Sequence, residues 1–218
     1  MVSLTAAMAL FVGTHFLMSH PLRGPMVGAL GEKGFLGVYS LISLALIAWA
    51  GFAYWAADGV QFWYASTWAV AAGHVLMILA SILFVGSVIA PNPALVGAGG
   101  LLAGMDEPRG VMRITRHPMM WSFALWALVH IALAGRADTL VFAGGIAFLA
   151  LAGSAGQDAR KRRQLGEAWA AYAGKTSYWP RPAWPGILPV VLGAAFYAAL
   201  VWLHPLLIGR TTRLWEVF

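Results

Sequence analysis

The stretch that decides the fold reads RGVMRITRHPMMWSFALWALVHIALAG and covers residues 109–135. Its first part carries three arginines, which are too costly to place in hydrocarbon. After Pro118 the stretch contains no Asp, Glu, Lys or Arg. Proline suits the first position of a helix, because its missing N–H has no partner there. The pattern predicts a membrane boundary near His117 and a membrane-spanning helix that starts beside it.

The composition indicates an integral membrane protein. Of 218 residues, 61% are hydrophobic and 10% are charged, whereas soluble proteins carry about a quarter charged residues. Cysteine is absent, which excludes disulfides, thiolate nucleophiles and iron–sulfur clusters. Histidine and methionine are the only soft or borderline metal ligands left. The net charge of +6 comes from short loops between apolar runs, so it indicates membrane orientation and not nucleic-acid binding.

The fold class that we predict is all-α, a polytopic bundle of about six transmembrane helices. Apolar runs long enough to cross about 30 Å of hydrocarbon cover 2–20, 35–57, 67–90, 118–135, 139–157 and 186–208. Eleven of the 14 lysines and arginines lie in the loops after the first, third and fifth runs. The positive-inside rule makes those loops cytoplasmic. Both termini then lie on the outer side, and the chain is a multi-pass membrane protein.

Two segments outside the spans have their own patterns. Residues 92–104 are rich in proline and glycine, which predicts an irregular or re-entrant loop. Residues 158–174 place Leu165, Trp169 and Tyr172 at helical spacing opposite a basic face. This pattern is typical of an amphipathic helix on the inner membrane surface, anchored electrostatically to anionic lipid. The fourth and fifth spans, only four residues apart, predict a tight helical hairpin.

Histidines are the candidate functional residues. His15, His74, His130 and His204 lie within predicted spans, with His20 and His117 at the cytoplasmic edges. Ionisable residues inside a membrane are functional hypotheses by default, and neutral imidazole is a common metal ligand and an axial ligand of haem. Alternatively, each ring bonds a carbonyl of a neighbouring helix.

Depth in the membrane leaves the pairing of these histidines open. At 1.5 Å per residue, His15 lies nearest the level of His117, and His74 or His130 lies nearest the level of His204. His130 shares a helix face with aromatic and small residues that could support a flat macrocycle or simply pack. These residues are Phe123, Trp126, Ala127 and Ala134.

A family resemblance rests on three segments in order. They are FVGTHFLMSHPLR at 11–23, RITRHPMMWSFALWALVHI at 113–131 and DARKRRQLGEAWAAYAGKTSYWP at 158–180. Together they resemble the NnrU family of bacterial membrane proteins over nearly the whole chain, which implies a single domain over 1–218. NnrU proteins are linked to denitrification. They are similar to the plant zeta-carotene isomerase, which uses haem b to isomerise a double bond of a hydrophobic polyene.

This resemblance implies haem b as cofactor, with His15 and His130 as axial ligands and catalytic residues. Arg113, Arg116 and His117 would hold an anionic group such as a haem propionate, and Trp126 would line the macrocycle. In the plant enzyme a cysteine precedes the second histidine by one turn, where this chain has Ala127. The departure bears on isomerase activity and not on haem binding.

Two alternatives remain open at this point. Arg116-His117-Pro118, a helical hairpin and the segment that follows, with Glu167, resemble the membrane methyltransferases of the isoprenylcysteine and phospholipid type. In that reading the cofactor is S-adenosylmethionine. The third reading is a non-catalytic assembly or regulatory factor with partner membrane proteins, in which the histidines are structural.

Overall fold

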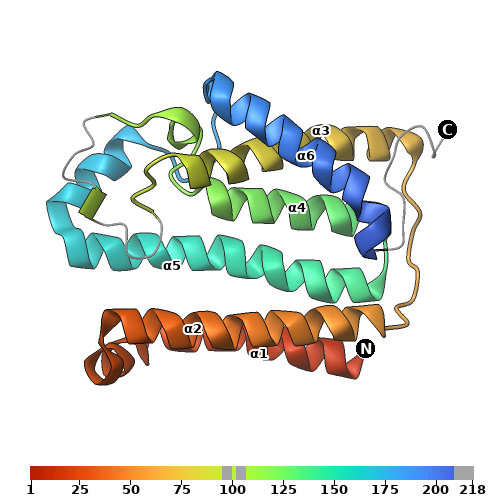
Figure 1. Cartoon of the computed structure of the whole chain (residues 1–218), viewed down its shortest axis with the longest axis horizontal. Coiled ribbons are helices and arrows are strands. Elements are labelled where there is room, and N and C mark those ends of the chain that lie inside the picture. Colours follow the sequence, from red (N-terminus) through yellow and green to blue (C-terminus); the bar gives the residue numbers. More distant parts are fainter. Residues whose placement is uncertain (95–99, 102–106, 209–218) are drawn as a thin grey trace. The chain divides into compact units, whose positions relative to one another are not determined.

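The computed structural model describes residues 1–94, 100–101 and 107–208, and over these residues the chain is all-helical (Figure 1). Five helices are long and apolar enough to cross a membrane, while α4 has 17 residues. The described helices are α1 (Val2–Ser19), α2 (Arg23–Trp55), α3 (Thr67–Ile89), the 3-10 helix η2 (Gly110–Arg113), α4 (Pro118–Ala134), α5 (Ala137–Lys175) and α6 (Ile187–Ile208).

The predicted spans agree with the observed helices except at two ends. Helix α2 begins at Arg23 and α5 extends to Lys175, because hydropathy detects the apolar part of a helix and not its polar continuation. Helices α2 and α5 are each interrupted by a glycine with positive φ. The glycine is Gly31 in α2, with φ of 69°, and Gly166 in α5, with φ of 50°. Glycine adopts this conformation without the penalty of a Cβ. The chain changes direction at both positions.

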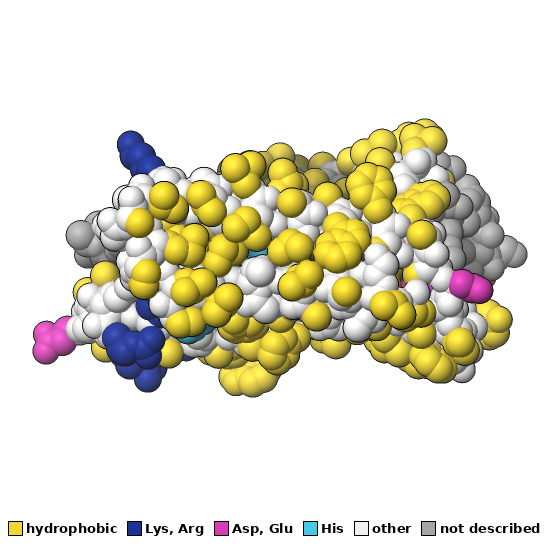
Figure 2. All heavy atoms as spheres, turned by 90° about the horizontal axis from the view of Figure 1, so that it is seen from below, with side chains coloured by type: hydrophobic (Ala, Val, Ile, Leu, Met, Phe, Trp, Pro, Cys, Tyr) yellow, Lys and Arg dark blue, Asp and Glu magenta, His cyan; other side chains and the backbone are white. Residues whose placement is uncertain are grey.

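The chain divides into two compact units, of which unit 1 contains Met1–Ala65 and His130–Leu149. Within it, α1 and α2 lie side by side. Small residues such as Ala7 and Ala50 allow this close packing. Figure 2 looks onto the face that carries α1 and α2, and hydrophobic side chains cover it between charged ends. Leu41 on α2 is 68% exposed, which is the surface expected of a helix that faces lipid.

The connection between α2 and α3 is bound to the turn between α4 and α5, also within unit 1. Gln61 pairs with Arg136 in an isolated bridge. The Phe62 N–H donates to the Gly135 carbonyl at 2.7 Å, and the Ala137 N–H donates to the Val60 carbonyl at 3.0 Å. The tight hairpin predicted between the fourth and fifth spans is confirmed. The strap formed by residues 60–63 was not predicted.

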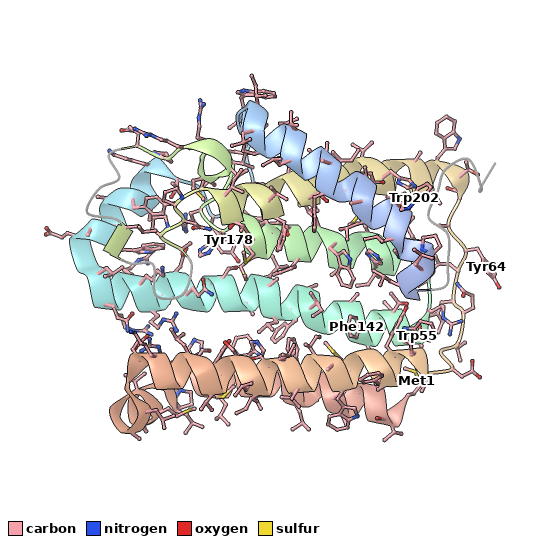
Figure 3. All side chains as sticks on the ribbon, viewed as in Figure 1. Met1, Trp55, Tyr64, Phe142, Tyr178 and Trp202 are labelled. Atoms are coloured by element: carbon pink, nitrogen blue, oxygen red, sulfur yellow. The ribbon has the colours of Figure 1, made fainter. Side chains whose placement is uncertain are left out.

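An ion pair completes this strap. The Asp138 carboxylate accepts from Arg136 Nη2 at 2.6 Å and from the Gly59 N–H at 3.2 Å. The hydrogen bond from Arg136 to Asp138 raises the pKa of the Arg136 guanidinium above its usual value. Phe142, labelled in Figure 3, lies on α5 one turn after Asp138. The centroid of its ring lies 5.4 Å from that of Tyr54.

Unit 2 contains Ser66–Val129 and Ala150–Phe218, and its centre is the contact between α3 and α6. At Gly193 on α6, a Cβ would lie 2.6 Å from the Cα of Ile82 on α3. Helices approach this closely in membranes where a glycine stands at the contact. The rings of Phe84 and Phe196 stack at 5.6 Å. The core consists of Ile82, Leu83, Val111, Met112, Trp121, Ala124 and Ala150.

The last part of α5 packs on protein. Trp169 is fully buried and Tyr172 is 6% exposed, and both pack with Ala94. The expectation that this apolar face rests on the membrane surface is wrong, because the face is buried in a separate small cluster with Ala94 and Leu165 after the break at Gly166. The loop predicted at 92–104 is irregular at 92–94, while 95–99 and 102–104 lie outside the described residues.

Candidate functional site

A buried ionic cluster lies at the start of α4, and we call Arg116, His117, Asp158 and Tyr178 the Asp158 cluster. One carboxylate oxygen of Asp158 accepts from Arg116 Nε at 2.8 Å and from Arg116 Nη2. The other accepts from His117 Nε2 at 2.6 Å. His117 is 2% exposed. The carboxylate therefore bonds two basic side chains that are consecutive in the sequence, and all of these residues belong to unit 2.

The backbone around η2 positions the cluster. The Arg116 N–H donates to the Ser177 carbonyl at 2.8 Å, which places the segment after α5 against the segment before α4. The Tyr178 carbonyl accepts from Thr115 Oγ1 at 2.7 Å and from Trp121 Nε1 at 2.8 Å. Figure 3 labels Tyr178 beside the first turn of α4. Its ring lies 5.6 Å from the Arg116 guanidinium carbon, so the tyrosine covers the cation.

Asp158 is the residue of this cluster that sequence reasoning missed. We expected Arg116 and His117 to face an anionic group of a cofactor, and in the structure an internal carboxylate fills that role. Arg113 is exposed, and its backbone carbonyl accepts from Arg181. The position of Asp158 in the sequence is the signal that could have identified it. It is the first charged residue after the apolar run of α5, and in an antiparallel hairpin that position lies level with the start of α4.

His15 on α1 has a hydrogen-bond arrangement that leaves one nitrogen as an unprotonated acceptor. Its Nδ1 lies 2.7 Å from the Phe11 carbonyl, so Nδ1 carries the proton and donates it. Its Nε2 lies 3.3 Å from Ser43 Oγ. The Ser43 hydroxyl donates its only proton to the Tyr39 carbonyl at 2.7 Å. The Nε2 lone pair therefore faces an oxygen whose proton is already used.

Aromatic rings surround the His15 imidazole. Phe11 lies 4.4 Å from it and Tyr39 5.1 Å, measured between ring centroids. The imidazole is half-buried in an apolar helix. This environment favours the neutral ring, which is the form that binds metals.

The remaining candidates are distributed over both units. His130 on α4 is half-buried and belongs to unit 1, as does His15, whereas Trp126 belongs to unit 2. Ala127 belongs to the helix face of aromatic and small residues that His130 shares. It has no exposed surface, so helix packing accounts for Ala127. His74 bonds the Tyr197 hydroxyl, which matches the structural alternative, and His20 is exposed.

Among the described residues there is no group of three or more His, Asp or Glu side chains that could hold a metal ion. Haem needs fewer protein ligands than such a metal site, because the porphyrin supplies four ligands to the iron and the protein supplies at most two.

These features define an all-helical membrane protein with an ionic cluster where α4 begins. A family model described as NnrU protein matches residues 3–212. The chain therefore belongs to the NnrU family, and the resemblance found in the three sequence segments is confirmed. Comparison with curated proteins and with solved structures gave no match.

Proposed function

We propose that the protein binds haem b within the membrane, with His15 and His130 as the axial ligands of the iron. The observation that carries the proposal is the His15 hydrogen bond from Nδ1 to the Phe11 carbonyl. Histidines that bind metals usually donate their other ring N–H to a carbonyl or carboxylate, which fixes the tautomer and the ring orientation. His15 has this arrangement, with Nε2 as the acceptor.

The donor set fits haem. Two neutral imidazoles are a common axial pair, and both histidines belong to unit 1. Bound haem would supply an iron centre able to act on a hydrophobic, polyene-like substrate that enters from the bilayer. The protein's own contribution is to orient the imidazoles and to exclude water from the site. We do not assign Arg116 and His117 to a propionate, because Asp158 already bonds both side chains.

The visible spectrum of the detergent-purified protein tests this proposal. The wild-type protein is expected to show a Soret band after expression with a haem precursor. His15→Ala and His130→Ala should each reduce bound haem at least about tenfold, because each removes an iron ligand. His20→Ala is the matched control on the same helix, since its ring is exposed, and it should retain the spectrum.

Other outcomes have defined meanings. A colourless protein that also fails to take up added hemin contradicts haem binding. If such a protein retained S-adenosylmethionine, the methyltransferase reading would replace it. A haem content that is unchanged in His130→Ala and lost in His15→Ala would assign the second ligand to another residue.

We further propose that α1 to α6, including the shorter α4, all cross a bacterial inner membrane with both termini periplasmic. Because the chain has no cysteine, single cysteines can be introduced at exposed loop positions such as Asp58 and Arg113. In intact spheroplasts an impermeant maleimide should label Asp58→Cys and should label Arg113→Cys only after permeabilisation. The reverse labelling pattern would invert the proposed topology.

A further inference from the structure

Two buried donors near the end of α5 have no acceptor among the residues that the structure describes. Within that part of the chain, Trp169 Nε1 and the Tyr172 hydroxyl have no hydrogen-bond partner, although both side chains are at least nine-tenths buried. An unsatisfied buried donor costs about 1–3 kcal/mol. The two residues are one turn apart on the helical segment after Gly166, and their rings lie 5.4 Å apart. Two such donors side by side indicate a ligand that supplies acceptors.

The surroundings of these donors are cationic. The Lys161 ammonium lies 5.2 Å from the centre of the Trp169 ring and donates to the Pro93 carbonyl. An acceptor group with negative charge suits this position better than a neutral carbonyl.

We propose that the end of α5 binds a phosphoryl group, with Trp169 Nε1 and the Tyr172 hydroxyl as donors and Lys161 as the nearby charge. A phosphoryl group offers several acceptor oxygens and at least one negative charge. It can come from the headgroup of an anionic phospholipid or from a soluble phosphate.

Thermal unfolding of the full chain in detergent tests the site. Inorganic phosphate at about 10 mM should raise the wild-type midpoint by a few degrees relative to chloride at equal ionic strength if the site takes soluble phosphate. Vesicles of phosphatidylglycerol should do so relative to phosphatidylcholine if it takes a lipid headgroup. The double variant Trp169→Phe/Tyr172→Phe removes both donors, so it should respond to neither.

A second readout separates ligand binding from a purely structural role. Without any phosphate source, the single variant Tyr172→Phe, which loses only the hydroxyl, should be as stable as the wild type or more stable, because it no longer buries that unpaired donor. A Tyr172→Phe protein that is less stable without phosphate overturns the proposal, since the hydroxyl would then be satisfied within the protein. The matched control is Tyr64→Phe/Trp184→Phe, whose side chains are exposed, and it should respond like the wild type.

The remaining outcomes also decide the question. A wild-type protein that responds to neither phosphate source overturns the proposal, and so does a double variant that responds in full. None of these measurements requires haem, so their result is independent of the proposed function.

Discussion

Replacing Gly135 with alanine is expected to prevent the turn between α4 and α5 from closing in its native form. Gly135 has φ of +60°, which costs an L-residue with a Cβ about 1–2 kcal/mol. A Cβ at this position would also overlap the carbonyl oxygen of Trp63 and lie 2.9 Å from its ring. Since that carbonyl is backbone, the strap of residues 60–63 would have to move. Thermal unfolding in detergent should show a large loss of stability or no folded protein.

Gly144→Ala is the matched control for this prediction. Gly144 lies on α5 in the same unit, and a Cβ there meets nothing within 4 Å. Alanine also has the higher helix propensity, so Gly144→Ala should be neutral or slightly stabilising. Equal unfolding temperatures for the two variants would mean that the strap does not hold the turn.

The second large effect is expected at Asp158. Replacing it with alanine leaves the Arg116 guanidinium buried without its carboxylate and leaves His117 Nε2 without an acceptor. Removing one partner of a buried ion pair costs about 3–5 kcal/mol. The free energy of unfolding, measured by denaturant titration in mixed micelles, should fall by about this amount. The exposed Glu167 on the same helix provides the control, and Glu167→Ala should change little.

A double variant tests the cause of this loss. Because an unpaired buried charge is the source of the cost, Asp158→Leu combined with Arg116→Leu should be more stable than Asp158→Ala alone. If the double variant unfolds as readily as the single one, the carboxylate stabilises the protein through contacts other than the Arg116 pair.

Most of the helical arrangement could be predicted from sequence, because apolar runs of the right length have few alternatives in a membrane. Pro118 marked the start of α4, and α4 begins there. Hydropathy could not locate the start of α2 at Arg23 or the end of α5 at Lys175, since both helices continue into polar sequence. The break at Gly166 depends on a single glycine whose φ no local pattern specifies.

The candidate sites were predictable only in part. Arg116 and His117 could be recognised as functional candidates. Their partner Asp158 stands next to a run of basic residues, and that run is typical of a surface helix and not of a buried ion pair. Residues far apart in sequence meet here through the hairpin, and residue spacing alone does not specify such contacts. His15 was a candidate from its depth in an apolar run. The Phe11 carbonyl fixes its tautomer, but the Ser43 hydroxyl that faces Nε2 belongs to another helix, and sequence alone could not reveal that contact.

The break at Gly166 also affects how peptide fragments should be interpreted. A synthetic peptide covering 158–175 would expose Trp169 and Tyr172 beside its basic residues, and such a peptide should adsorb to anionic vesicles. In the intact chain those rings are enclosed by protein. Adsorption of the fragment would therefore describe an isolated helix and would not locate the lipid-contacting surface of the whole molecule.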